Sequence, residues 1–375
     1  MPVLAILGPR QSGKTTLARA AFSKHIYISL ENFEEREFAL RDPQHFLEVN
    51  TNEYGIILDE IQHVPQLLSY IQTRVDEAHK PGYFILTGSQ NILVNQAVSQ
   101  TLAGRVAIFT LLPLSIAELR VNKLLPSTIE ALAVKGSYPR IYAYDLEPTP
   151  WYQDYIETYV EKDVRLIANV VNLSLFRKFI RLCAGRIGQL LNIASLATEC
   201  GIDQRTAKAW LSVLEASYII FLLQPHHVNF NKRLTKSPKL YFYDAGLICA
   251  LLDIKSEAHL NDHYLRGNII ESLMISEIFK HYYNNADRPN NVYFWRNQTG
   301  NEIDCIIQKG VALIPIEIKA SKTIVSDFFK GLTYWSELTE LPPSGYIIYG
   351  GEKNQSRKEG SVVSWHNIED VFKTD

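Results

Sequence analysis

The stretch Gly8-Pro9-Arg10-Gln11-Ser12-Gly13-Lys14-Thr15 decides the fold of the first third of this chain. It matches the pattern GxxxxGK[ST] without a mismatch and stands between an apolar run, residues 3–7, and a helical pattern. The glycines let successive backbone N–H groups curl around phosphate oxygens, and the following helix directs its positive N-terminus at the same anion. The stretch therefore predicts a phosphate-binding loop, with a chance glycine-containing turn as the alternative.

ATP and Mg²⁺ are the ligands expected at this loop. Lys14 is expected to reach the β and γ phosphates as a catalytic cation, and the Thr15 hydroxyl to hold Mg²⁺. The residues predicted to bind the nucleotide are Gly8, Pro9, Arg10, Gln11, Ser12, Gly13, Lys14, Thr15, Thr16 and Ser89.

A second motif, Ile56-Ile57-Leu58-Asp59-Glu60, follows the loop. Its three apolar residues predict a buried strand that ends in two carboxylates. Asp59 is expected to join the magnesium shell, and Glu60 to polarise the attacking water as a general base. A strand that ends in Asp-Glu is often a solvated turn, but behind a phosphate loop it indicates hydrolysis of the nucleotide.

Four further residues are candidates for contacts with phosphate. Ser89 and Gln90 follow an apolar run at 84–86, and either sense the γ-phosphate or form a plain strand-end turn. Arg105 and, as a second candidate, Arg140 would place positive charge on a phosphate of their own subunit or of a neighbour. For both arginines a surface salt bridge is the competing interpretation.

Composition limits what the rest of the chain can be. The 375 residues, 46% of them hydrophobic, suffice for two or three domain cores, and 21% charged residues argue against wholesale disorder. The net charge of −2 means that any basic surface must be local. No apolar run approaches the roughly 20 residues that span a bilayer, and no leader is evident, which predicts a cytoplasmic protein without a membrane partner. The four cysteines form no CxxC pair, so buried thiols are expected.

Alternating apolar runs and helical patterns predict an α/β protein that begins with a parallel sheet. The strands of this sheet are expected at 3–7, 25–30, 55–58, 83–86 and 106–111. Plausible linkers lie at 148–150 and 256–262. The predicted domains are an ATPase core at 1–120, a helical extension at 121–173, a winged helix at 174–255 and a further α/β domain at 256–375.

The quoted motifs resemble a known family. The segments GPRQSGKTTLA, IILDEIQ, ILTGSQ, LAGRV and PLSIAEL resemble the prokaryotic AAA-type ATPases that carry an uncharacterised nuclease-like C-terminal domain. The similarity continues through GSYPR and YIETYVEKDV and covers nearly the whole chain. It implies an AAA-type P-loop sheet and ATP binding more firmly than any biological role. Because AAA enzymes commonly assemble, the resemblance also implies a homo-oligomer, although no feature of the sequence specifies one.

Residues 196–207 fit a short helix, a turn at Gly201 and a second helix, and strands expected at 218–223 and 239–243 would complete a winged helix. Gln204, Arg205 and Lys208 begin the second helix, where base edges or phosphates would be met. Only three acidic residues lie between 174 and 239, and a local basic patch predicts DNA as a partner. A protein-docking module or a structural lid is the alternative. The basic residues of this segment are Arg177, Lys178, Arg181, Arg186, Arg205, Lys208, Lys232, Arg233, Lys236 and Lys239.

The second chemical signature is Glu302-Ile303-Asp304, then twelve residues, then Glu317-Ile318-Lys319, with Glu271 in a preceding helical pattern. It resembles the PD-(D/E)xK nuclease superfamily, which implies a restriction-nuclease-like α/β domain. Strand alternation places Glu317 and Lys319 on one face. Glu271, Asp304 and Glu317 are the predicted metal ligands, and Asp304, Glu317 and Lys319 the predicted catalytic residues, with Lys319 orienting water or stabilising the phosphate.

Two functions remain open at this stage. The first is Mg-dependent ATP hydrolysis coupled to DNA binding or processing by the nuclease-like domain. The second is a nucleotide-controlled protein-interaction switch whose nuclease-like domain is catalytically inactive, since a fold can be kept for binding without cleavage.

Overall fold

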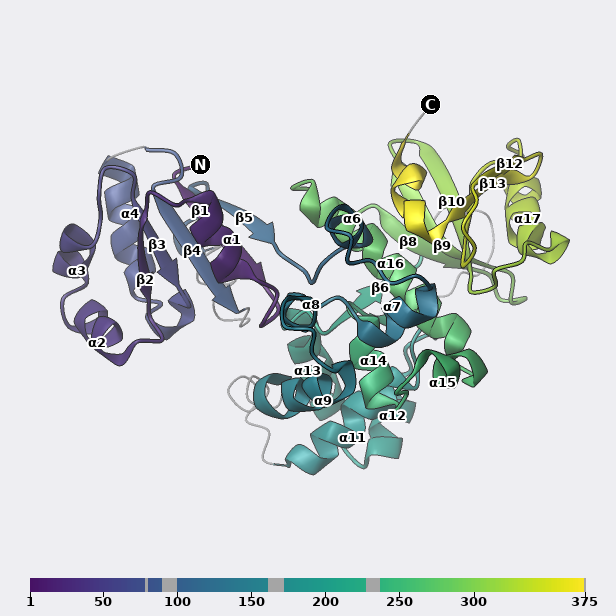
Figure 1. Ribbon diagram of the computed structural model, residues 1–375, viewed down its shortest axis with the longest axis horizontal. Helices are drawn as coiled ribbons and strands as arrows, with labels where there is room; N and C mark the ends of the chain where they lie inside the picture. The colour runs from purple at the N-terminus through teal and green to yellow at the C-terminus, as the bar shows by residue number, and fades with distance from the viewer. Residues whose placement is uncertain (78–79, 90–99, 161–171, 227–236, 374–375) are drawn as a thin grey trace.

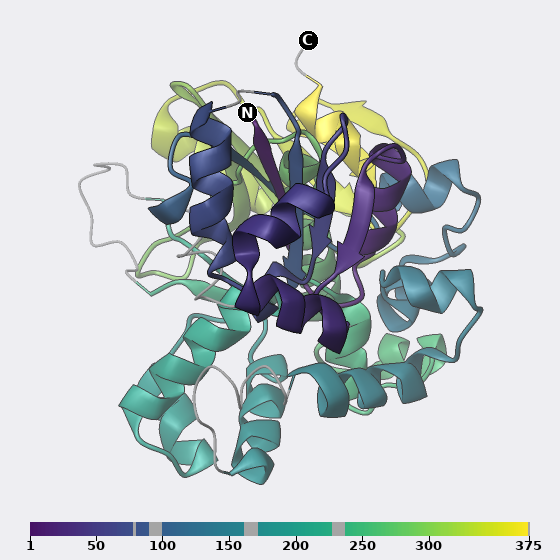
Figure 2. The same cartoon turned by 90° about the vertical axis from the view of Figure 1, so that its left-hand side faces the viewer.

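The computed structural model describes residues 1–77, 80–89, 100–160, 172–226 and 237–373. Figure 1 shows an amino-terminal sheet at the left, a group of helices below the centre and a second sheet at the upper right. The strand β5 leads from the first sheet toward the other parts of the chain, and the view in Figure 2 has the first sheet and its helices in front.

The amino-terminal sheet has five parallel strands in the order β2-β3-β4-β1-β5, which confirms the predicted parallel sheet. The strands are β1 (Val3–Gly8), β2 (Ile26–Ser29), β3 (Ile56–Asp59), β4 (Phe84–Ser89) and β5 (Val106–Thr110). The helices beside them are α1 (Lys14–Ala21), α2 (Phe33–Arg41), α3 (Pro43–Val49), the 3₁₀ turn η1 (Ile61–His63) and α4 (Leu67–Glu77). Alternation along β1 buries Ala5 with α3 and α4 on one face and Ile6 with α1 on the other.

Parallel pairing determines where the polar residues of this sheet meet. The carboxyl ends of β1, β3 and β4 lie at one edge, because the register pairs Gly8 with Ser89 and Leu58 with Leu86. The phosphate loop follows β1 at this edge, and Asp59 ends β3 beside it. An edge of this kind is where open α/β sheets bind their ligands.

The described residues in the middle of the chain are mostly helical, as predicted for the extension at 121–173 and the helix–turn–helix at 196–207. Its elements are α6 (Ile116–Val121), α7 (Ile129–Lys135), α8 (Pro139–Ala143), α9 (Pro148–Tyr155), the π turn η2 (Ile156–Val160), α11 (Leu173–Ala184), α12 (Ile193–Cys200), α13 (Gln204–Ala216), β6 (Ile220–Leu223), β7 (Lys239–Phe242), α14 (Ala245–Leu251) and α15 (Glu257–Asp262). Helices α12 and α13 join through Gly201, whose φ of 82° is a left-handed conformation suited to glycine. The two predicted strands pair as the antiparallel hairpin β6–β7.

Each of the two predicted linker segments contains the start of a helix. Pro148 occupies the first turn of α9, where its missing N–H costs nothing. Ser256 caps α15 by accepting a hydrogen bond from the His259 N–H, and Leu260 of that helix is fully buried. The prolines and polar residues of these segments therefore mark helix starts.

The carboxy-terminal sheet is mixed, with the order β12-β13-β11-β10-β9-β8. Its elements are α16 (Arg266–Asn284), β8 (Val292–Arg296), β9 (Glu302–Lys309), β10 (Ala312–Lys319), η3 (Ser326–Phe329), α17 (Lys330–Thr339), β11 (Tyr346–Tyr349), β12 (Gln355–Arg357), β13 (Gly360–Ser364) and η4 (Trp365–Phe372). The strands β8 to β11 match the strands that the sequence predicts at 291–296, 302–308, 313–319 and 345–349. The strands β12 and β13 were not predicted, because β12 is short and wholly exposed and carries no apolar alternation.

The cores do not follow the predicted boundaries at 173 and 255. The amino-terminal sheet has cores of its own, but one continuous apolar cluster runs from Leu112 to Val371 through the helical segment, the β6–β7 hairpin and the last sheet. All four cysteines are buried, as expected. Among the described residues, no helix combines the length and apolarity needed to cross a bilayer.

Candidate functional site

The predicted phosphate loop wraps around its own lysine. The ammonium of Lys14 donates to the carbonyl oxygens of Gly8 at 3.1 Å and Pro9 at 2.7 Å, and the side chain is nearly buried. A Cβ at Gly8 would stand 2.1 Å from the carbonyl oxygen of Leu111, so only glycine fits there. The Ser12 hydroxyl is buried and has no hydrogen-bond partner among the residues that the structure describes, so it is a polar group suited to an anion in the loop.

Helix α1 begins directly after this loop. Gly13 precedes it with a φ of 95°. Because glycine has no side chain that could cap the helix, the first N–H groups of α1 have no side-chain cap and can face a ligand. Phosphate oxygens are the ligands that such a helix start attracts, through both the amides and the helix dipole. The fold of the loop therefore suits a nucleotide.

Thr15 and Asp59 face each other as predicted for a magnesium pair. The Thr15 hydroxyl lies 3.0 Å from each carboxylate oxygen of Asp59. Two ligand oxygens at adjacent corners of a Mg²⁺ octahedron are about 2.9 Å apart, so the two residues fit one ion. Hydroxyl groups of Tyr27, at 2.8 Å, and of Thr87 also donate to Asp59 and fix its orientation. Burial and the hydrogen bond to Asp59 raise the pKa of Tyr27 to about 12, so it stays a donor.

Glu60 follows at the tip of β3 in a conformation unusual for its residue type. Its φ of 58° is left-handed, which non-glycine residues adopt at a cost and which is frequent at active sites. The side-chain amide of Gln62 donates to the Glu60 carboxylate. A Cβ at position 88 would stand 2.8 Å from the Gln62 side-chain oxygen, so Gly88 leaves room for Gln62. Gln62, which the sequence analysis missed, orients the predicted base.

The other predicted phosphate contacts divide into two groups. Ser89 ends β4 beside Gly8, but its side chain and the whole of Gln90 lie outside the described residues, so the sensor role stays a prediction. Arg140 is exposed in α8 and stacks on Tyr144, one residue from Pro139, which approaches Gly13. No contact of Arg140 with the loop itself is seen in the described residues.

Arg105 lies at the wrong end of the sheet for its own subunit. Its carbonyl accepts from the N–H of Val3 at the start of β1, whereas the loop follows the end of β1. Its guanidinium binds Asp76 through two hydrogen bonds of 2.5 and 2.8 Å. The prediction that Arg105 serves the phosphates of its own subunit is therefore corrected, and a role toward a neighbouring copy stays a prediction.

Helix α9 contacts the phosphate loop from outside the sheet. The Tyr155 hydroxyl lies 3.4 Å from the carbonyl oxygen of Arg10 and accepts from the Tyr138 hydroxyl at 2.9 Å. Tyr138 is fully buried among Trp151 and Tyr152, so the contact rests on a packed aromatic group. The sequence analysis did not identify this link between the loop and the middle of the chain.

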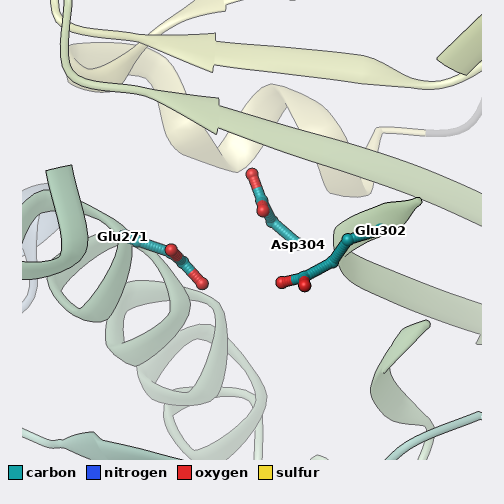
Figure 3. Close-up of side chains that lie close together, drawn as sticks. All are labelled: Glu271, Glu302 and Asp304. Atoms are coloured by element: carbon teal, nitrogen blue, oxygen red, sulfur yellow. The ribbon is translucent and has the colours of Figure 1, made fainter. Parts of the chain in front are cut away.

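The residues of the second signature meet in the carboxy-terminal sheet. Figure 3 shows Glu271 extending from α16 toward Glu302 and Asp304 of β9, and carboxylate oxygens of these three residues lie within 4.8 Å of one another. On β10, the Lys319 ammonium lies 2.5 Å from the Glu317 carboxylate and 3.7 Å from that of Asp304. We name the carboxylates of Glu271, Glu302, Asp304 and Glu317, with the ammonium of Lys319, the acidic centre.

Burial changes the acid strength of two of these carboxyls. It raises the pKa of Glu317 to about 8, and Asp304 adds to this effect while Lys319 opposes it. It raises the pKa of Glu271 to about 7, with Lys239 opposing and Asp304 adding. Burial is thus the main cause of both raised pKa values, and the neighbouring carboxylate of Asp304 adds to it.

A cation that the sequence analysis assigned elsewhere already lies in the acidic centre. Lys239 of β7 was counted in the basic surface, but it is only 1% exposed. Its ammonium lies 3.1 Å from the Glu271 carboxylate and forms an ion pair with Glu302. The Tyr241 hydroxyl donates to the same Glu271 oxygen. A divalent ion shared by Glu271 and Glu302 would meet this ammonium, so the arrangement does not fit a metal there.

The predicted basic surface is smaller than the sequence suggested. Arg177, Arg181 and Arg186 form ion pairs with Glu157, Asp253 and Glu199. Lys232, Arg233 and Lys236 lie outside the described residues. Gln204, Arg205 and Lys208 are exposed at the start of α13, where they were expected.

Residues 1–120 match a family model described as an AAA domain. This part of the chain is similar to AAA domains. Residues 127–258 and 266–368 match two further models, each described as a domain of unknown function, DUF8612 and DUF4143. The acidic centre draws its residues from both sides of the boundary between these two, because Lys239 belongs to the first and the carboxylates to the second.

The chain is similar to the uncharacterized protein Rv2008c of Mycobacterium tuberculosis, with 28% identity over 354 residues that cover 94% of this chain and 77% of the relative. Mb2031c of Mycobacterium bovis matches to the same extent. Among solved structures, the RuvB Holliday junction branch migration motor of Thermotoga maritima has 18% identity and a TM-score of 0.30 over 59% of this chain and 82% of its own. The Aeropyrum pernix Orc1 protein in complex with DNA has 14% identity and a TM-score of 0.26 over 68% and 87%.

Proposed function

We propose that this protein binds ATP with Mg²⁺ in its AAA domain and hydrolyses it. The observation that carries the proposal is the 3.0 Å approach of the Thr15 hydroxyl to the Asp59 carboxylate beside the loop that holds Lys14. The magnesium ion would be held by these two residues and would neutralise charge on the phosphates. The unpartnered Ser12 hydroxyl and the uncapped start of α1 support a triphosphate in the same loop.

The residues of the AAA domain divide the chemistry among them. Backbone amides at residues 8–15 bind the phosphate oxygens, and Lys14 leaves the loop carbonyls to bind the β and γ phosphates. Glu60 takes the proton of the attacking water, while Gln62 keeps its carboxylate in position. Tyr155 holds the loop from the side of α9, so a loop that rearranges around phosphate also acts on the helical segment.

The direct test is release of inorganic phosphate from ATP by the purified full-length protein. Turnover that requires Mg²⁺ and stops with EDTA supports the proposal. Protein that binds ATP but releases no phosphate, with and without DNA, contradicts hydrolysis and leaves only a nucleotide-binding role.

We further propose DNA as a partner, bound by the helix–turn–helix of α12 and α13. The strands β6 and β7 are largely buried and are not part of the proposed contact. Helix α13 starts with the exposed Gln204, Arg205 and Lys208, and Asp203 caps it by accepting from the Thr206 N–H. Side chains at the start of a recognition helix are those that enter the groove or contact the phosphates.

The double substitution Arg205→Ala and Lys208→Ala is expected to weaken DNA binding by roughly tenfold in low salt. Two lost phosphate contacts should also reduce the slope of log K against log salt concentration by about 1.8. Fluorescence anisotropy of a labelled duplex at several salt concentrations measures both quantities. The control pair Lys24→Ala and Lys123→Ala removes the same charge from exposed sites outside α13. A slope equal in both double variants would exclude α13 from the interface.

A second candidate function is a nucleotide-controlled interaction switch in which the acidic centre performs no chemistry. The ion pairs of Lys239 with Glu271 and Glu302 favour it. Nicking of plasmid DNA in Mg²⁺ or Mn²⁺ by the wild type, lost in Asp304→Ala, would support a nuclease instead. Absence of nicking in both supports the switch.

A further inference from the structure

We infer that Lys239 is the resident cation of the acidic centre and takes the place that a divalent metal ion would occupy between Glu271 and Glu302. The inference does not depend on ATP hydrolysis, because it concerns a site in another part of the chain. It rests on where the ammonium lies, on how rigidly it is held and on the charges around it.

The backbone of Lys239 in β7 is bonded on both sides. Lys239 is opposite Leu223 in the β6–β7 hairpin and forms a bridge with Leu190 on its other side. The next residue, Leu240, donates to Gln189 at 3.2 Å and accepts from Gly188 at 2.9 Å. A strand bonded on both sides fixes the Cα of Lys239, and the ion pairs with Glu271 and Glu302 then hold its ammonium.

The surroundings of Lys239 bury almost all of its side chain. Its side chain is 2% exposed and passes over the ring of Phe294, with the nitrogen 5.5 Å from the ring centre. Tyr241, two residues on and therefore on the same face of the strand, donates to the Glu271 oxygen that Lys239 also contacts. A metal ligated by that oxygen would have to displace both groups.

Cations of the protein lie beside the carboxylates of the acidic centre. Glu302 has two cations, Lys239 and Arg296, the latter at 3.1 Å. Lys319 pairs with Glu317 and Asp304, and Asp304 also accepts from the Ile318 N–H at 2.8 Å. Three cations, Lys239, Lys319 and Arg296, thus lie among four carboxylates. The ammonium of Lys239 occupies the space between Glu271 and Glu302 that a divalent ion would need.

The same geometry gives the ammonium a structural role. It joins β7 of the middle segment to α16 and β9 of the carboxy-terminal part, where a metal ion would otherwise hold the carboxylates together. Removal of the ammonium leaves converging carboxylates with oxygens spaced for a shared ion. The neutral variant should therefore gain the metal site that the wild type lacks.

The test measures Mn²⁺ binding by electron paramagnetic resonance without nucleotide, in full-length protein that carries Asp59→Asn to remove the site at Thr15. This parent is expected to bind no Mn²⁺ at a concentration of about 100 μM. Addition of Lys239→Met to this parent should create one Mn²⁺ site with a Kd at least tenfold below that concentration. Further addition of Asp304→Asn should abolish the site. The control Lys330→Met, at an exposed lysine of α17, should gain none.

Thermal unfolding provides a second readout that does not need a fully stable variant. Lys239→Met should lower Tm by at least about 5 °C, because the carboxylates lose a buried partner, and Mn²⁺ should restore part of the loss. Mn²⁺ bound by the parent and lost on adding Asp304→Asn would overturn the inference, whether or not the Lys239 variant folds. A folded Lys239→Met protein that gains neither Mn²⁺ nor thermal stabilisation by it would overturn it as well.

Discussion

Replacement of Lys14 by alanine is expected to weaken ATP binding by about 100-fold or more. The ammonium is the main cation of the phosphate loop, and a charged hydrogen-bonding group of this kind contributes about 1.5–3 kcal/mol per contact. The loop should otherwise keep its shape, because Gly8 and Gly13 determine its backbone. Isothermal titration calorimetry with ATP and Mg²⁺ measures the loss.

Lys24→Ala is the matched control for Lys14→Ala. Lys24 is exposed in the same domain and its ammonium lies over the ring of Tyr54. The control protein should bind ATP as the wild type does. Equal affinity in Lys14→Ala and Lys24→Ala would mean that the phosphates bind elsewhere.

Replacement of Glu60 by glutamine is expected to reduce kcat by roughly 10²- to 10⁴-fold, the contribution typical of a positioned general base. The affinity for ATP should change little, because Glu60 contacts the water and not the phosphates, and glutamine preserves the size of the side chain. Phosphate release under saturating ATP, together with a binding titration, separates the two effects.

Glu53→Gln makes the same chemical change at an exposed position of the AAA domain and should leave kcat unchanged. If Glu60→Gln and Glu53→Gln turn over ATP equally well, Glu60 is not the base. The left-handed backbone at Glu60 is retained in both proteins, so a difference between them reports on the carboxylate.

The AAA domain was predictable from sequence because its signals are local. The phosphate loop is one contiguous stretch, and each strand of the sheet is a short apolar run whose period and length identify it. Parallel pairing then brings Thr15 and Asp59 together without further information. Gln62 was missed, since nothing in a single sequence tells an orienting amide from an ordinary turn residue.

The acidic centre was predictable only in part. Strand alternation places Glu302 on the same face as Asp304, so the sequence alone could have added Glu302 to the predicted ligands, although it was not among them. Lys239 lies in a different element from Glu271. Its basic neighbours in the sequence suggest an exposed basic surface, and only the fold shows that Lys239 is buried. Pairing between elements that a tertiary fold brings together leaves no mark in the local pattern of a single chain.

Binding of ATP to the wild-type protein, measured by calorimetry at millimolar Mg²⁺ and repeated in EDTA, tests the central claim most directly. The arrangement of Lys14, Thr15 and Asp59 predicts saturable binding close to one ATP per chain that weakens when the metal is removed. Folded protein that takes up no ATP in either condition would contradict the account.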